Sequence, residues 1–309
     1  MKGIATLTMN PSLDMSCSVE RVSADRKLRA EDLRREPGGG GINVSRAVKE
    51  LGGVATAIYL AGGPLGDMLE TLLDGQEIRQ RPISIAAHTR ENVTVLERET
   101  DKQYRFVMPG PEVIDEETER CFRELFSGFS RPDFLLASGS LPPGVPEEFY
   151  ARAAAEARGR RIRFILDTRG EPLRLALKEG LYLAKPNLRE LREATGKPLE
   201  KHDQVAEAAR GLVEDGAAEV VVVSLGADGV VLAQRDGTSA IAAPEVPVKS
   251  KVGAGDSMLA GIVLRLAEDK SVAEAVRFGV AAGTAAVTTP GTRLCERLET
   301  ERLYREMTR

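Results

Sequence analysis

Two glycine-rich turns carry the strongest chemical signals in the sequence. The first has glycines at positions 38, 39, 40 and 41, and it runs through Ile42 and Asn43 into a predicted helix. Glycine lets the backbone approach a ligand closely, and the first turn of a helix offers free N–H groups. Asn43 both donates and accepts hydrogen bonds, which suits a polyol. The run is neither a GxGxxG fingerprint nor a Walker A loop, and a flexible turn is an equally good explanation.

The second turn is Gly253-Ala254-Gly255-Asp256, which also opens a predicted helix. Its amides lie at the positive end of the helix dipole and could form an anion hole. Asp256 beside that hole could take a proton from a hydroxyl group that attacks a phosphoryl group. An aspartate at the start of a helix is also a common cap, so this motif alone leaves both readings open.

Two strand ends add candidates for an anion or nucleotide site. Lys185 follows the predicted strand 181–184, and its point charge at the carboxyl edge of a sheet suits a phosphate. Pro186 fixes the next turn, and Asn187 is a candidate N-cap. The predicted strand 220–224 ends in a glycine turn. A plain strand-to-helix connection and an ordinary hairpin explain these two features equally well.

Elements that can position these turns alternate along the chain. The run of four valines at 220–223 is typical of a strand buried on both faces. The alternation predicts an α/β fold, a doubly wound and mostly parallel sheet with helices on both faces. Strands are expected at 4–9, 54–61, 134–138, 162–167, 181–184, 220–224 and 230–233, and helices at 42–51, 68–73, 147–158, 188–195, 205–214 and, apart from a turn at 288–292, through 271–309.

Two segments, at about 15–36 and 87–108, break this alternation. The first is polar and charged, and the second alternates apolar and polar residues around a hairpin turn at 99–102. We expect them to form a small β-sheet lid over the carboxyl edge of the main sheet, where ligands bind in open α/β sheets. A peripheral decoration is the alternative. With no repeat or long linker, residues 1–309 are expected to form a single domain with the lid segments inserted.

Composition excludes several classes of protein. The net charge of −4 shows no basic excess, which disfavours binding to nucleic acid. Three cysteines without CxxC spacing disfavour a disulfide framework or a zinc site. The two histidines lie outside GxSxG and HExxH contexts, which disfavours a hydrolase triad or a histidine metal site. No apolar run reaches the ~20 residues of a membrane span, and the N-terminus lacks a signal peptide, so we expect a cytoplasmic protein.

The order and spacing of the four motifs resemble those of the ribokinase-like sugar kinases of the phosphofructokinase-B type, over essentially the whole chain. Further stretches at 10–14, 103–110, 138–144 and 277–283 are similar to the branch of bacterial minor 6-phosphofructokinases, and less fully to 1-phosphofructokinases and tagatose-6-phosphate kinases. The resemblance implies ATP-dependent phosphorylation of a ketohexose phosphate, with fructose 6-phosphate first and fructose 1-phosphate or tagatose 6-phosphate as alternatives. A nucleoside kinase and a catalytically idle relative that only binds nucleotide or sugar are further alternatives.

The resemblance also implies a role for each candidate residue. The catalytic base would be Asp256, with the amides of Gly253, Ala254 and Gly255 as the anion hole for the transferred group. Sugar hydroxyls would be held by Asp14, Gly39 and Asn43, and the phosphate already on the sugar by Arg90 and Ser140 with help from Lys27. The ATP site would be lined by Lys185, Asn187, Ser224, Gly226 and Gly229, while Asn187 and Glu190 would act on Mg²⁺ through water.

Partners and ions follow from the same resemblance. The lid segments would pair with those of a second copy and give a homodimer. The family usually has threonine two residues before the Gly-Ala-Gly-Asp run, next to a monovalent-cation site, whereas this chain has Lys251. Potassium activation is therefore in doubt. Either the Lys251 ammonium replaces the ion on nearby loop carbonyls, such as those of 288–291, or the side chain points to solvent and leaves the ion site intact.

Overall fold

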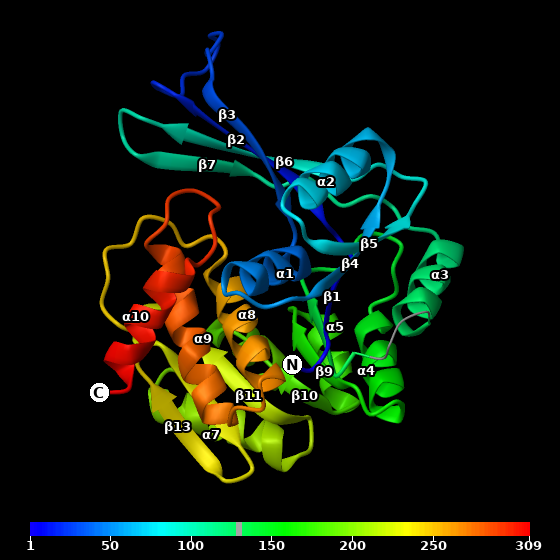
Figure 1. The fold of residues 1–309 in the computed structure, drawn as a ribbon, viewed down its shortest axis with the longest axis vertical. Helices are drawn as coiled ribbons and strands as arrows, with labels where there is room; N and C mark the ends of the chain where they lie inside the picture. The colour runs from blue at the N-terminus through cyan, green and yellow to red at the C-terminus, as the bar shows by residue number, and fades with distance from the viewer. Residues whose placement is uncertain (128–131) are drawn as a thin grey trace.

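A sheet of nine strands forms the main body of the computed structural model, which describes residues 1–127 and 132–309 (Figure 1). The seven strands from β11 to β5 pair in parallel, and β12 and β13 extend one edge as antiparallel strands. Their order is β13 (Gly237–Ile241), β12 (Val230–Gln234), β11 (Ala218–Ser224), β10 (Leu181–Ala184), β9 (Arg163–Asp167), β8 (Phe134–Ser138), β1 (Ile4–Thr8), β4 (Thr56–Ala61) and β5 (Arg79–Ser84).

Helices cover both faces of this sheet, and each face has its own apolar core. A third, smaller cluster packs α1 and α2 against β4. The doubly wound fold predicted from the sequence is thereby confirmed. One face carries α3 (Asp115–Phe126), α4 (Phe149–Gly159), α5 (Glu171–Lys178), α6 (Leu188–Thr195) and α7 (His202–Glu214), and the other carries α1 (Gly40–Glu50), α2 (Gly63–Gly75), α8 (Ala254–Ala267), α9 (Val272–Val287) and α10 (Arg297–Met307).

The predicted strands and helices are all present, with ends shifted by a few residues, but several elements were missed. Strand β5 reads Arg-Gln-Arg-Pro-Ile-Ser and lies at the edge of the sheet. An edge strand tolerates polar residues and a proline, which removes one N–H from the ladder, so the usual strand pattern is absent. Strand β13, helix α3 and helix α5 were also missed.

A second sheet projects from the carboxyl ends of the central strands (Figure 1). It contains β3 (Glu31–Gly38), β2 (Ser12–Val19), β6 (Arg90–Glu97) and β7 (Lys102–Phe106), in that order. Strands β2 and β6 pair in parallel, and the outer pairs are antiparallel. The hairpin between β6 and β7 lies where the sequence predicts it. We call these four strands the small sheet.

The four consecutive glycines are required by close packing rather than by flexibility. A Cβ atom on Gly38 would lie 2.4 Å from the Asp14 carboxylate, and one on Gly40 would lie 2.2 Å from the Ser138 hydroxyl. A Cβ on Gly41 would lie 2.4 Å from the carbonyl oxygen of Leu7 at the end of β1. The glycines therefore let the first turn of α1 lie directly against the carboxyl ends of β1 and β8.

The substitution Gly41→Ala tests this packing. Its methyl group would meet main-chain atoms that cannot rotate away, so we expect a loss of about 1–3 kcal/mol in the free energy of unfolding. The control is Gly75→Ala, since nothing lies within 4 Å of a Cβ on this helical glycine. That change should be neutral or stabilising by up to about 1 kcal/mol. Urea unfolding of both variants is the measurement, and equal stabilities would contradict the close approach.

Candidate active site

The two glycine-rich turns meet at one hydrogen bond. Gly253 caps α8 with a left-handed φ of 74°, which places Asp256 in the first turn of the helix. The Asn43 Nδ2 atom, in the first turn of α1, donates to Asp256 Oδ2 at 2.9 Å, across 213 positions of sequence. Asp256 Oδ1 has no partner among the described residues and stays available as an acceptor. The structure thus brings Asn43 and Asp256 together at the carboxyl edge of the main sheet.

A buried cation lies beside this pair. The Lys185 side chain is buried at the end of β10, and its Nζ atom is 3.1 Å from Asp167 Oδ1. The same Nζ atom lies 3.5 Å from the position that a Cβ on Gly255 would take, so it faces the start of α8. Burial lowers the pKa of Lys185, but the charge and hydrogen bond of Asp167 outweigh burial and leave this pKa raised. Lys185 is therefore a permanent positive charge next to the free amides of 253–255.

Asp167 was not among the sequence candidates. It follows the buried residues Phe164, Ile165 and Leu166 as the last residue of β9. A carboxylate directly after a buried parallel strand was the available signal, because that position faces the ligand edge of the sheet.

The surroundings of Asp256 make it a usable proton acceptor. The pKa of Asp256 is raised to about 6, mainly by burial and in addition by the charge of Asp167. The hydrogen bond from Asn43 and the charges of Lys185 and Arg46 oppose it. A carboxylate in this range is ionised at neutral pH, yet it is more basic than an exposed aspartate, as general-base chemistry requires.

A second group of polar residues lies where the small sheet leaves the main body. The Arg90 guanidinium donates to the carbonyl oxygens of Asn10 at 3.0 Å, Pro11 at 3.3 Å and Met108 at 3.0 Å. Asn10 Nδ2 in turn donates to the Ser140 hydroxyl at 3.2 Å. Burial lowers the pKa of Arg90, and Asp14 opposes this. Arg90 and Ser140 therefore belong to one network, as the resemblance implies.

Asp14 and Gly39 lie between this network and the Asn43–Asp256 pair. Asp14 Oδ1 accepts hydrogen bonds from Ser12 Oγ at 2.7 Å and Asn92 Nδ2 at 2.9 Å. The main-chain oxygen of Gly39 accepts from the Asn43 N–H at 2.9 Å, in a residue with φ of 113°. Asp14 is thus joined to Asn92 of β6, the strand that begins at Arg90, and Gly39 is joined to Asn43.

Lys27 does not join this group within one chain. It is exposed in the loop between β2 and β3, beyond the end of the small sheet where Val19 pairs with Glu97. Arg90 pairs with Ser12 at the opposite end. The eight residues of β2 separate these ends by roughly 20–25 Å. A basic cluster of Lys27 and Arg90 in the same chain is therefore wrong.

The nucleotide-side candidates gather around the start of α6. Asn187 caps this helix: its Oδ1 atom accepts from the Glu190 N–H at 2.9 Å, and Glu190 Oε2 accepts from the Asn187 N–H at 2.8 Å. Ser224 forms a β-bridge with Asn187, and a cavity of about 300 Å³ opens beside both residues. Gly226 and Gly229 have positive φ values of 68° and 91° in the β11–β12 turn. The same turn joins the antiparallel strands β11 and β12, so the ordinary hairpin that the sequence offered as the alternative interpretation is also present.

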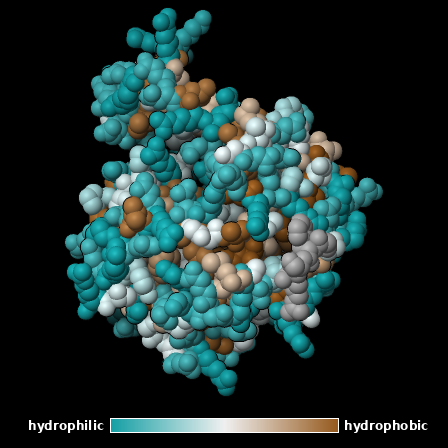
Figure 2. Space-filling view, viewed as in Figure 1, coloured by the Kyte–Doolittle hydropathy of each residue, from teal (hydrophilic) through white to brown (hydrophobic). Residues whose placement is uncertain are grey.

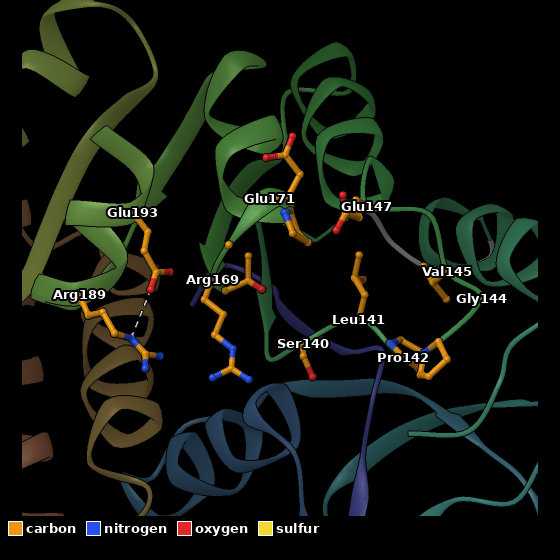
Figure 3. A pocket seen from close by; sticks show the side chains of 14 residues that line it. Ser140, Leu141, Pro142, Gly144, Val145, Glu147, Arg169, Glu171, Arg189 and Glu193 are labelled. Carbon is orange, nitrogen blue, oxygen red and sulfur yellow. Dashed lines mark ion pairs between the residues drawn. The ribbon is translucent and has the colours of Figure 1, made fainter. Parts of the chain in front are cut away.

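A larger cavity of about 620 Å³ lies between the loop after β8, which carries Ser140, and Arg189 at the start of α6. In Figure 3, Ser140 and Arg169 extend from neighbouring strand ends into this space, and Arg189 of α6 forms an ion pair with Glu193 at 3.6 Å. Arg169 has no hydrogen bond or ion pair with any residue in 1–127 or 132–309. The sequence candidates did not include Arg169, although it follows β9 directly after Asp167 and Thr168.

The described residues contain no cluster of three or more histidine, cysteine or acidic side chains that could hold a metal ion by themselves. Burial raises the pKa of Glu190, and Asp167 adds to this rise, so a cation near Glu190 would be favourable. Magnesium usually keeps several water ligands and binds through one or two carboxylates together with substrate phosphates. The single carboxylate of Glu190 with Asn187 fits that pattern.

Lys251 does not lie on the loop carbonyls that it was expected to reach. Its side chain is exposed and makes no ion pair or hydrogen bond with the rest of the described chain. The carbonyl oxygen of Gly291 instead accepts a hydrogen bond from the Ser250 hydroxyl at 2.6 Å. Of the two readings of Lys251, the structure shows the one in which the side chain points to solvent.

Cys17, Cys121 and Cys295 are free thiols. Among the described helices, none is both long and apolar enough to cross a membrane.

Comparisons with known proteins agree over the whole chain. The sequence pattern of the pfkB family of carbohydrate kinases matches residues 8–299. The ATP-dependent 6-phosphofructokinase isozyme 2 of Mycobacterium tuberculosis is 45% identical over 97% of this chain and 88% of its own length. The 1-phosphofructokinase of Bacillus subtilis is 31% identical over 98% of this chain and 97% of its own. A crystal structure of Escherichia coli phosphofructokinase-2 in complex with potassium superposes with a TM-score of 0.96 at 41% identity and covers 100% of both chains.

The substitution Asp256→Asn tests the electrostatic state of the site without any assay of turnover. Because folding raises the pKa of Asp256 from 3.8 to about 6, the folded protein is stabilised by the protonated form, and this stabilisation is lost as pH rises from about 4 to 6. Asparagine carries no charge, so the variant should be more stable than the wild type at pH 7.5, by at most about 3 kcal/mol. The difference should shrink toward pH 4.

Melting temperatures of both proteins between pH 4 and 8 provide the measurement. Asp203→Asn is the matched control, because Asp203 is an exposed aspartate in the first turn of α7. It should show no gain at neutral pH and at most a loss of about 0.3–1 kcal/mol from the helix dipole. A difference between wild type and Asp256→Asn that does not change with pH would contradict the raised pKa.

Proposed function

The chain belongs to the pfkB family of carbohydrate kinases, and we propose that it transfers the terminal phosphoryl group of ATP to fructose 6-phosphate, giving fructose 1,6-bisphosphate. The enzyme class, a phosphotransferase with an alcohol group as acceptor, follows from the family and its relatives. The observation that carries the proposal is the Asn43–Asp256 hydrogen bond beside the buried Lys185, at the start of α8. A sugar phosphate other than fructose 6-phosphate is less favoured, because the 1-phosphofructokinase relative is 31% identical against 45% for the 6-phosphofructokinase.

The geometry supports an in-line transfer. Asp256 Oδ2 is held by Asn43, and Oδ1 is free to take the proton from the attacking sugar hydroxyl. As the new bond from the sugar oxygen to the γ-phosphorus forms, the bond from that phosphorus to the β,γ-bridging oxygen breaks and ADP leaves. The free amides of 253–255 and the Lys185 ammonium neutralise the charge on the oxygens of the transferred group. Phosphoryl transfer needs little covalent help from the protein, so positioning and charge stabilisation account for most of the catalysis.

Arg90 and Ser140 would hold the phosphate already on the sugar. Three of the five guanidinium N–H groups of Arg90 are used on carbonyl oxygens, which leaves two for a phosphate. Asp14, Gly39 and Asn43 would contact the sugar hydroxyls. At the other end, Lys185, Asn187, Ser224, Gly226 and Gly229 would line the nucleotide site. Asn187 and Glu190 would hold Mg²⁺ through water, where the ion neutralises charge on the ATP phosphates.

A turnover screen tests this function. Purified protein with Mg²⁺ and ATP is assayed against fructose 6-phosphate, fructose 1-phosphate, tagatose 6-phosphate, fructose, ribose and adenosine, and kcat/KM should be highest for fructose 6-phosphate. Asp256→Asn should lose about 10²–10⁴-fold in kcat with little change in KM for ATP. Arg90→Gln should raise KM for the sugar phosphate far more than for ATP. Equal use of fructose and fructose 6-phosphate, or near wild-type turnover by Asp256→Asn, would refute the assignment.

We also propose that two copies pair through the small sheet. The register places Met15, Val93 and Phe106 in one row across the sheet and Cys17, Val95 and Tyr104 in the next row of the same face. Phe106 is 52% exposed and Tyr104 36% exposed. Figure 2 shows apolar side chains on this projecting part of the molecule. Covering such a face with a second copy removes it from water, and Lys27 could reach a sugar phosphate only in another copy.

The substitution Phe106→Asp should therefore give a monomer at micromolar concentration, because a carboxylate would be buried in the paired face. Leu298→Asp is the control, since Leu298 is 81% exposed on α10, outside the small sheet, and should not change the association state. Sedimentation velocity measures both variants. A wild-type protein that sediments as a fully active monomer would contradict the pairing.

Finally, we propose that potassium activates the enzyme. The loops around 250–253 and 288–291 touch through the Ser250–Gly291 hydrogen bond, and the exposed Lys251 side chain contacts none of their carbonyl oxygens. The relative of E. coli has been crystallised with potassium. Turnover should rise several-fold in potassium over tetramethylammonium at fixed ionic strength, in the wild type and in Lys251→Gln alike. Equal turnover in both salts would contradict activation by potassium.

A further inference from the structure

We propose that Arg46, held by Glu36 of the small sheet, is a positioning residue that fixes the Asn43 amide so that its NH₂ group faces the catalytic carboxylate. The inference rests on the function proposed above, in which Asp256 is the base. Neither Arg46 nor Glu36 was a candidate from the sequence, and neither reaches the reacting atoms.

Arg46 lies one helical turn after Asn43 on α1, on the same face of the helix. Its Nη1 atom donates to Asn43 Oδ1 at 3.3 Å and to the carbonyl oxygen of Pro37 at 3.0 Å. Its Nε atom donates to Gln76 Oε1 at 2.8 Å. The side chain is only 11% exposed. Besides Asn43, the guanidinium is thus held by two further partners, Pro37 and Gln76.

The two ends of an asparagine amide have nearly the same shape, so their neighbours decide which end points where. In this site the oxygen of Asn43 faces the Arg46 guanidinium and the nitrogen faces the Asp256 carboxylate. The reversed amide would place N–H groups against a cation and an oxygen against an anion. Without the cation, only the contact with Asp256 would favour the observed orientation, and that contact weakens whenever Asp256 takes up a proton.

Glu36 holds Arg46 from the small sheet. Its Oε1 atom is 3.5 Å from Arg46 Nη2, and its carboxylate also accepts a hydrogen bond from the Thr292 hydroxyl. Glu36 lies in β3 and pairs in register with Asp14 of β2. The contacts Thr292–Glu36–Arg46–Asn43–Asp256 therefore connect the loop after α9, the small sheet and α1 to the base. Through this chain, the position of the small sheet bears on the alignment of Asp256.

The charged groups and the hydrogen-bond donor that face Asp256 come from three elements. Asn43 and Arg46 approach from α1, Asp167 from β9 and Lys185 from the end of β10. Arg46 and the Asn43 hydrogen bond both favour the ionised carboxylate. Loss of Arg46 would remove one of these effects directly and weaken the other, so the pKa of Asp256 would rise further.

The test compares Arg46→Gln, Arg46→Lys and Glu36→Gln. A cavity of about 490 Å³ adjoins Arg46, so water can fill the space that a shorter side chain leaves. Arg46→Gln should lower kcat about tenfold or more, leave KM for ATP within about twofold, and move the acid limb of the kcat/KM profile to higher pH. Arg46→Lys keeps the positive charge but lacks the planar guanidinium group. Its acid limb should therefore lie close to that of the wild type, while its kcat should remain lower. Glu36→Gln should act in the same direction as Arg46→Gln with a smaller loss.

Arg35→Gln is the matched control, because Arg35 precedes Glu36 on β3 and forms an exposed ion pair with Glu91 at 3.2 Å. It should leave the pH profile unchanged. A wild-type kcat and acid limb in folded Arg46→Gln would overturn the inference. So would a loss of kcat with an unshifted acid limb and a lower melting temperature, which would indicate a purely structural role.

A second readout needs no turnover and separates this inference from the proposed function. The stability difference between the wild type and the Asp256→Asn variant has a pH midpoint that reports the pKa of Asp256. When the Arg46→Gln variant is compared with the double variant Arg46→Gln/Asp256→Asn, that midpoint should lie at a higher pH. If the wild type phosphorylates none of the sugars, the proposed function fails, and an upward midpoint still supports the coupling of Arg46 to Asp256. An unchanged midpoint overturns it.

Discussion

The site depends on keeping a carboxylate ionised in a place that disfavours its charge. Asp256 lies half-buried at the start of α8, and its pKa is raised to about 6, mainly by burial. The neighbouring carboxylate of Asp167 makes ionisation harder, so the local positive groups must compensate. Lys185 does this directly, and Asn43 donates the one hydrogen bond that Asp256 accepts from the described residues. Because each compensating group comes from a different strand end or helix start, the charge is stable only when the whole carboxyl edge of the sheet is assembled.

That requirement explains the composition of the turns. Two helices, α1 and α8, must begin against the same sheet edge, close enough for their first turns to share a hydrogen bond. A Cβ at Gly38, Gly40 or Gly41 would overlap with atoms of β1, β2 or β8, so the glycine run is fixed by packing. Gly255 at the start of α8 likewise lies near Lys185, whose Nζ atom is 3.5 Å from the position that a Cβ on Gly255 would take. Close packing and phosphate binding therefore both require glycine in these turns.

The sequence predicts much of this arrangement because its signals are local. Continuous valines predict β11, glycine turns predict the helix starts, and an alternating pattern predicts the β6–β7 hairpin. What escaped prediction is decided by distant contacts. Pro82 suits β5 only because that strand lies at an edge, and Asp167 matters only because Lys185 of the adjacent strand end is buried against it. Lys27 was placed beside Arg90 by the family resemblance, whereas strand register separates the two within one chain.

The hydrogen bonds of Arg90 stabilise the small sheet and also position this side chain in the site. Its guanidinium contacts carbonyl oxygens of 10–11, where the chain enters β2, and of Met108, where it leaves β7. It therefore joins the entry and exit of the small sheet before any ligand binds. A side chain already fixed in this way loses little conformational entropy when it binds an anion with its two remaining N–H groups. The phosphate of a substrate would thus meet a prearranged cation, and its charge would strengthen the junction that holds the small sheet over the carboxyl edge of the main one.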